Sequence, residues 1–96
     1  MPNRIDLRRQ QGRITIPLAV RLFLGMALLI ALAIGVSQHC SGCIGFHVKA
    51  LLKLGATRAE LEEMLAVSVY MGGGPSLMYA AEALKAWDTM AEAHTA

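Results

Sequence analysis

The residues with the clearest chemical potential are two cysteines, Cys40 and Cys43, followed four positions later by His47. In a helix, residues three or four positions apart share a face, so both thiols and the imidazole would lie on one patch. The thiolate is the reactive form of cysteine, and a helix N-terminus or a neighbouring histidine lowers the thiol pKa. The spacing therefore predicts a redox-active dithiol with its own base.

Three other interpretations of these residues compete with redox chemistry. A haem attachment site would place histidine directly after the second cysteine, where Ile44 stands, and is excluded. Zinc could use both thiolates and His47, with His39 as a fourth ligand, but structural zinc sites draw ligand pairs from separate segments, and His94 makes no convincing second pair. Two inert buried cysteines beside a core histidine are the third alternative. We favour redox chemistry and predict no bound metal or cofactor.

The expected mechanism follows from thiol chemistry. His47 accepts the proton of Cys43, whose thiolate attacks a peroxide and becomes a sulfenic acid. Cys40 then condenses with it to a disulfide, which an external dithiol reduces by exchange. Cys40 lies nearer the helix end and could instead have the lower pKa, so the order of the two thiols stays open at this point.

Composition indicates one domain with a large apolar surface to cover. The 96 residues are 55% hydrophobic, with a mean hydropathy of +0.47, so the chain either enters a membrane or buries this surface between copies. The apolar run from Leu22 to Val36 fits a core helix of an oligomer, a membrane helix or a signal sequence. We favour the core helix, because a membrane span needs about twenty apolar residues and Arg21 prevents this run from extending toward the N-terminus. A bridge between cysteines so close in sequence would contribute little stability, so a working dithiol in a reducing, cytoplasmic compartment fits better.

The first part of the chain differs from the rest in charge. Residues 1–13 are predicted to form a flexible basic arm with four arginines, and residues 14–96 a helical domain. Because only one aromatic residue, Phe23, occurs in the first 45 residues, no stacking platform accompanies the arm, and we do not expect nucleic-acid binding.

The hydrophobic periodicity predicts an all-α fold of about four helices and no strand. The helices are expected over residues 16–38, 40–54, from Thr57 to the glycines at 72–74, and 75–93. Gly55 should end the second helix with a positive φ, and Thr57 with Glu60 forms a capping-box pattern at the start of the third. The buried face of the third helix is predicted to hold Leu61, Met64, Leu65, Val67, Ser68 and Met71.

Several segments then give the chain a family resemblance. Residues 29–47, with C-x-x-C-x-x-x-His, residues 53–60, with Gly-Ala-Thr, residues 67–75, with Met-Gly-Gly-Gly-Pro, and residues 79–82 resemble the alkylhydroperoxidase-like branch of the carboxymuconolactone decarboxylase family. The resemblance covers roughly residues 26–88. It implies a helical fold assembled as trimers or hexamers, and a CxxC peroxidase or disulfide reductase without metal or flavin that can use lipoyl-type dithiols. On this pattern Cys43 attacks the peroxide, Cys40 resolves the intermediate and His47 relays the proton.

One position departs from that pattern. The branch usually carries a glutamate twelve residues before the first cysteine, where this chain has Leu28, and no acid occurs between Asp6 and Glu60. The missing carboxylate would have to come from another subunit or from a later residue. The alternative is a redox-active or structural helical oligomer without efficient peroxide turnover; membrane association and the decarboxylation known in the family's other branch are not expected. The later acids weighed for this role are Glu60, Glu62, Glu63 and Glu82.

Overall fold

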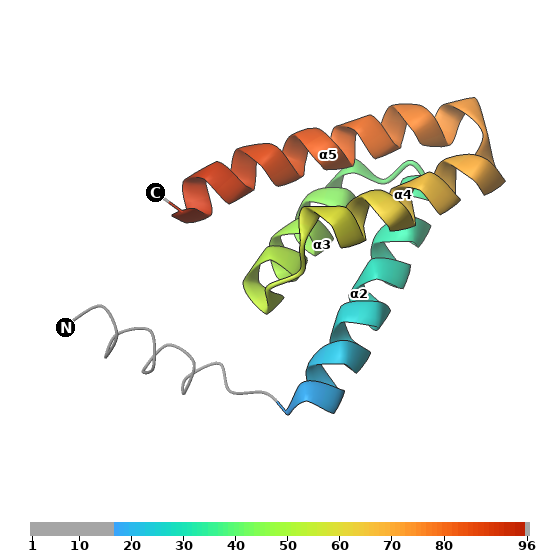
Figure 1. The fold of residues 1–96 in the computed structure, drawn as a ribbon. Helices are drawn as coiled ribbons and strands as arrows, with labels where there is room; N and C mark the ends of the chain where they lie inside the picture. Colours follow the sequence, from blue (N-terminus) through green and yellow to red (C-terminus); the bar gives the residue numbers. More distant parts are fainter. Residues whose placement is uncertain (1–16, 96) are drawn as a thin grey trace.

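The computed structural model describes residues 17–95, and within them the fold consists of four helices with no strand. They are α2 (Leu18–Ser37), α3 (Ser41–Leu54), α4 (Arg58–Gly72) and α5 (Gly74–Thr95). The expected all-α class is confirmed, and the predicted basic arm of residues 1–13 lies outside the described residues. In Figure 1, α5 runs across α3 and α4, while the first half of α2 projects away from them.

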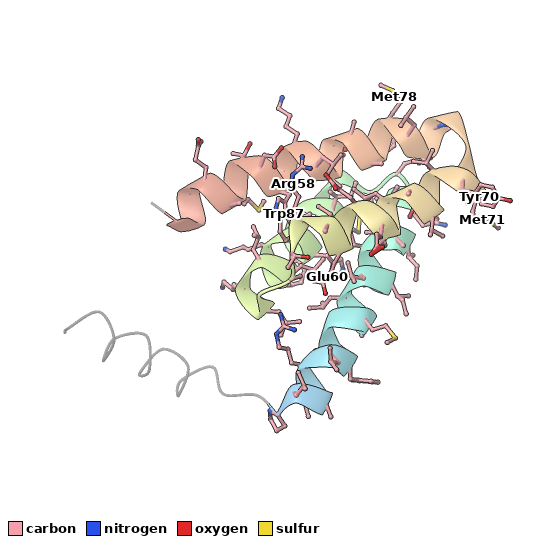
Figure 2. The ribbon with its side chains drawn as sticks, in the orientation of Figure 1. Arg58, Glu60, Tyr70, Met71, Met78 and Trp87 are labelled. Carbon is pink, nitrogen blue, oxygen red and sulfur yellow. A yellow bond between two sulfur atoms is a disulfide. The ribbon has the colours of Figure 1, made fainter. Side chains whose placement is uncertain are left out.

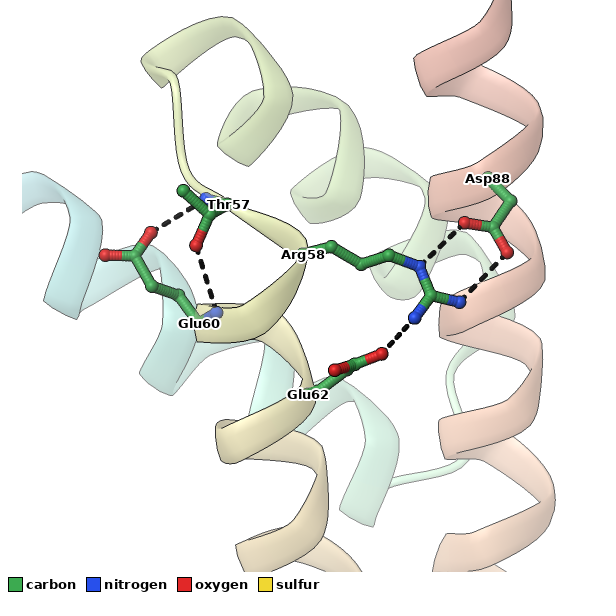
Figure 3. A network of polar contacts seen from close by, with 5 residues as sticks. All are labelled: Thr57, Arg58, Glu60, Glu62 and Asp88. Carbon is green, nitrogen blue, oxygen red and sulfur yellow. Dashed lines mark hydrogen bonds and ion pairs between the residues drawn. The ribbon is translucent and has the colours of Figure 1, made fainter.

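The helix boundaries follow local sequence signals. Gly55 caps α3 in the left-handed region, with φ 93°, as only glycine does readily. Thr57 caps α4 through the predicted capping box: its hydroxyl accepts a bond from the Glu60 amide, and the Glu60 carboxylate accepts one from the Thr57 amide (Figure 3). Gly73, with φ 77°, makes the corner between α4 and α5. The observed α5 begins at Gly74, one residue before the predicted start.

The core lies where all four helices meet. Each helix contributes a narrow stripe of buried side chains, and in α2 this stripe is confined to the second half of the helix. Trp87 of α5 lies against the helices beneath it, only 5% exposed (Figure 2). The buried apolar residues are Leu32, Val36, Ile44, Val48, Leu51, Leu61, Leu65, Ala80, Ala83 and Trp87.

An ion-pair network on the surface links α4 to α5. The Arg58 guanidinium donates to both carboxylate oxygens of Asp88, at 2.9 and 3.0 Å, and pairs with Glu62 one turn along α4 (Figure 3). The hydrogen bond from Arg58 holds the pKa of Asp88 below its ordinary value, although partial desolvation opposes this effect. Because the network is exposed, it orients the two helices more than it stabilises them.

The buried face predicted for α4 is only partly correct. Leu61, Leu65 and Ser68 are buried and Met64 is half-buried, but Val67 and Met71 are exposed. The reason is that α2 does not fully cover α4: an apolar groove of about 480 Å³ lies between the two helices and is lined by both residues.

The outer face of α2 is also uncovered. Leu18, Phe23, Met26, Ile30 and Ile34 are all more than half exposed. By length and composition α2 could cross a membrane, although only 17% of its most apolar stretch is buried, and core helices and signal sequences share these properties. An exposed apolar face of this size is typical of an interaction surface and not of the core of a single chain.

Candidate redox site

The two cysteines lie at the start of α3, directly after the turn that follows α2. Cys40 is the N-cap residue, in extended conformation, and its Sγ accepts a hydrogen bond from the Cys43 amide at 3.2 Å. The two residues are joined by a disulfide, with their Cα atoms 5.2 Å apart. Helix N-termini stabilise negative charge, so a thiolate formed at Cys40 on reduction would be favoured by its position.

Close packing of α2 against α3 supports this turn. Gly35 of α2 is buried, and a Cβ atom built on it would lie 3.2 Å from the Cβ of Cys43. Carbon atoms pack best at about 3.5–4.0 Å, so any side chain at position 35 would press on the second cysteine. The absence of a side chain is thus what lets α2 pass so near the dithiol.

His47 lies four residues after Cys43 on α3, at the spacing that shares a helix face. The residue is half-buried, and its Nδ1 atom is buried without a hydrogen-bond partner among the described residues. The Phe46 ring packs against the imidazole edge-on, with 5.3 Å between ring centres. A buried polar atom without a partner costs about 1–3 kcal/mol, so packing alone does not account for histidine at this position.

The resemblance to the alkylhydroperoxidase-like branch placed its usual carboxylate at position 28, on α2. Leu28 is half-buried and packs against the hydrophobic core. No residue of α2 carries a carboxylate, so this helix supplies no acid to the dithiol.

Both neighbours of Cys40 in the chain contact α5. The imidazole of His39 stacks on the Tyr79 ring, with centres 4.6 Å apart and planes 6° from parallel. The Ser41 hydroxyl donates to Glu82 Oε2 at 3.1 Å. Tyr79 and Glu82 are three residues apart and therefore lie on one face of α5. This face of α5 thus contacts the residue before Cys40 and the residue after it.

The backbone at this turn is itself unusual. His39 has φ 58°, the one positive value among the described residues other than glycine. A left-handed backbone is unfavourable by about 1–2 kcal/mol for an L-residue with a side chain, and such conformations gather at functional sites. The Tyr79 stack is a contact that helps to hold it.

The zinc alternative required more ligands than the described residues bring together. Among them, no three histidine, cysteine or acidic side chains gather in a way that could hold a metal ion. His39 faces Tyr79 in the ring stack, and the His94 side chain lies outside the description.

Of the three residues predicted for the site, Cys40 is the N-cap of α3, Cys43 lies in its first turn and His47 lies one turn further along; their roles stay predictions. The sequence reasoning did not identify Tyr79 as part of the site, and it weighed Glu82 only as one of several acids. Residues 79–82 already stood out among the segments that carried the family resemblance, and that was the available signal. Their contacts with positions 39 and 41 span about forty residues and required the fold.

Comparisons with known proteins give the family and a similar solved fold. The model of the carboxymuconolactone decarboxylase family matches residues 24–86. The chain is 45% identical over 62 residues to an uncharacterized protein of Cupriavidus necator, a match covering 65% of this chain and 55% of that protein. It therefore spans about half the length of this curated relative. The crystal structure of apo-lpg0406, a carboxymuconolactone decarboxylase family protein from Legionella pneumophila, matches with a TM-score of 0.64 and 44% identity, covering 91% of this chain and 90% of that one.

Proposed function

The chain belongs to the carboxymuconolactone decarboxylase family, and from this premise we propose that it is a thiol-dependent peroxidase or disulfide reductase acting on alkyl hydroperoxides. The observation that carries the proposal is the Cys40–Cys43 disulfide at the N-terminus of α3, with His47 one turn beyond it. A bridge that closes so short a loop contributes little to stability, which favours a chemical role for the pair.

The oxidative half of the reaction consumes the peroxide. His47 takes the proton of Cys43, and the thiolate attacks the terminal peroxide oxygen, so that a sulfur–oxygen bond forms as the oxygen–oxygen bond breaks. The departing alkoxide takes up a proton and leaves as the alcohol. The Cys40 thiol then attacks the Cys43 sulfenic acid, releasing water and forming the disulfide.

The reductive half restores the dithiol. One thiolate of an external dithiol attacks the bridge, and the protein sulfur that is released leaves as a thiolate. Cys40 suits this leaving role, because its position at the helix N-cap stabilises negative charge. The second external thiol then resolves the mixed disulfide, so two electrons pass from the external dithiol to the protein.

Turnover with three variants tests the proposal. Wild type should consume an alkyl hydroperoxide in the presence of a dithiol reductant, and Cys43→Ser should not. Cys40→Ser should stop after one oxidation, with Cys43 left as a sulfenic acid. Ser37→Ala, in the exposed last turn of α2, is the matched control. Wild-type consumption no faster than that of Cys43→Ser would refute the peroxidase.

A second candidate function is supported by Leu28. Without an acid on α2 the proton relay of the family is incomplete, so the protein can instead be a redox-active scaffold whose dithiol oxidises without efficient peroxide turnover. Acid–base assistance contributes about 10²–10⁴-fold in rate. Rapid reduction of the disulfide together with negligible hydroperoxide consumption would favour this candidate.

We also propose that the protein is a homo-oligomer, a trimer or hexamer. The apolar outer face of α2 continues into the groove beside α4, and Tyr70, Met71 and Met78 point away from the helices near the α4–α5 corner (Figure 2). An apolar surface this extensive on a small domain calls for a covering partner, and a second copy supplies a complementary apolar face. A monomer in detergent-free buffer would contradict this assembly.

A further inference from the structure

We propose that the Glu82 carboxylate, acting through the Ser41 hydroxyl, is the acid–base partner of the Cys40–Cys43 dithiol. This inference rests on the proposed redox function and names a residue that it had lacked. Ser41 is the first residue of α3 and follows Cys40 directly, and its hydroxyl donates to Glu82 Oε2 at 3.1 Å. Glu82 thus reaches, from α5, the residue that directly follows Cys40.

Other carboxylates that the sequence had left as candidates are engaged elsewhere. Glu60 closes the capping box with Thr57, and Glu62 pairs with Arg58. Both lie in the first turns of α4, whereas Glu82 is bonded to a residue between the two cysteines. Glu82 is also half-buried, so solvent screens its charge less than that of an exposed surface acid.

The charged groups near the dithiol determine how an ionised Glu82 affects the two thiols. Along the chain, His39 and His47 are the titratable side chains nearest the cysteines, and Tyr79 and Lys85 are those nearest Glu82 on α5. The one charged residue in α2, Arg21, lies at its far end against Gly55, and the charged residues of α4 lie in its first two turns. An ionised Glu82 therefore opposes a neighbouring thiolate, while the α3 N-terminus favours either anion. The Ser41 hydroxyl connects the Glu82 carboxylate to the adjacent Cys40 thiol.

This connection supplies the proton that peroxide cleavage needs. Glu82 first gains the proton of the Cys40 thiol through Ser41, whose hydroxyl donates to the carboxylate in the structure, and it returns this proton through Ser41 to the alkoxide leaving the broken oxygen–oxygen bond. The Cys43 sulfur gains the terminal oxygen, the alcohol departs neutral, and Glu82 is left ionised. Because Glu82 acts through Ser41 and not on the reacting atoms, it is a positioning residue.

Four variants, compared with wild type, separate this role from a structural link between α3 and α5. Glu82→Gln keeps the shape and an oxygen that can accept the Ser41 hydrogen bond, but cannot titrate. Ser41→Ala removes the connection and leaves the charge. Glu63→Gln, on the exposed face of α4, is the control for loss of one negative charge. Glu82→Asp keeps a carboxylate at this position but with a shorter side chain than the wild-type glutamate. Circular dichroism checks that each variant is folded.

The first readout is the pH dependence of iodoacetamide alkylation of the reduced protein, which needs no peroxide turnover. Removing the Glu82 charge should shift the profile to lower pH, raising the alkylation rate below the midpoint by about 3- to 10-fold. Glu63→Gln should match wild type. The second readout is hydroperoxide turnover, which should fall by about 10- to 100-fold in Glu82→Gln and to a similar extent in Ser41→Ala.

The two readouts fail independently. If wild type shows no peroxide turnover but the alkylation profile of Glu82→Gln still shifts, the peroxidase proposal fails and the coupling of Glu82 to the dithiol stands. An alkylation profile of Glu82→Gln that coincides with those of wild type and Glu63→Gln would overturn the coupling, even if the variant were less stable. Full turnover in a folded Glu82→Gln would equally overturn its role in proton supply.

Discussion

Two glycines of α2 make a matched pair that tests how closely this helix packs against the dithiol. Replacing either one by alanine should gain about 0.4–1 kcal/mol, because alanine restricts the unfolded chain and favours the helix. At Gly25 the new Cβ would lie 3.6 Å from Leu54 Cδ2, an ordinary contact. At Gly35 it would lie 3.2 Å from the Cβ of Cys43, and overpacking of this kind costs about 1–3 kcal/mol. Gly25→Ala should therefore stabilise the protein, and Gly35→Ala should be neutral or destabilising by up to about 2.6 kcal/mol.

The assay is thermal unfolding followed by circular dichroism at equal protein concentrations, since assembly makes the melting temperature depend on concentration. For a chain of this size 1 kcal/mol corresponds to about 4–8 °C, so the two variants should melt at least about 4 °C apart. Only Gly35→Ala should also change the rate at which dithiothreitol reduces the disulfide. Equal stabilisation by both substitutions, with unchanged reduction rates, would refute the inferred close contact of α2 with Cys43.

The remaining predictions concern four other positions. His47→Leu removes a buried Nδ1 that lacks a partner, so the melting temperature should hold or rise while turnover falls by about 10²–10⁴-fold; loss of stability instead would mark His47 as a packing residue. Leu28→Glu should lower the free energy of unfolding by about 1–3 kcal/mol, because Leu28 packs on the core, and leave peroxide turnover no higher than in wild type, because Glu82 already supplies the acid; a rise in turnover would show that an acid is needed on α2. The pKa of Asp88 is lowered by its bond from Arg58, so this bond stabilises the fold above the unfolded-state pKa and is lost as pH falls through the folded-state pKa. Urea unfolding of Asp88→Asn should therefore differ from wild type at neutral pH and not in acid, and an equal difference at both would contradict the linkage. Met71→Lys should shift the sizing profile toward the monomer, and an unchanged profile would place the interface elsewhere.

Local signals in the sequence predicted the helices well. Gly55 and the Thr57–Glu60 capping box act within a few residues, so their effects need no knowledge of the tertiary structure, and both lie where they were predicted. The second helix was expected to begin at Cys40; in the structure Cys40 is its N-cap and the helix begins one residue later, at Ser41.

The surroundings of the dithiol were predictable only in part. The spacing of Cys40, Cys43 and His47 along one helix is local and was evident. The contacts of His39 with Tyr79 and of Ser41 with Glu82 join segments about forty residues apart, and their formation depends on how α5 crosses α3. Spacing along one helix contains no information about that crossing.

Periodicity also misjudged which apolar residues are buried. Val67 and Met71 have the spacing of a core face but line an open groove. A hydrophobic pattern marks the surfaces that avoid water, and it does not distinguish the core of one chain from a contact between chains. For the same reason, composition left open what covers the outer face of α2.

Mass spectrometry of the fully reduced protein, after addition of one equivalent of alkyl hydroperoxide, shows whether Cys40 and Cys43 form a working dithiol. We expect rapid loss of two hydrogen atoms, with the bridge mapped to Cys40 and Cys43. In Cys40→Ser we expect gain of one oxygen atom at Cys43, trapped by a reagent specific for sulfenic acids. Thiols that stay reduced, or that oxidise no faster than free cysteine under the same conditions, would show that the pair is not a working dithiol.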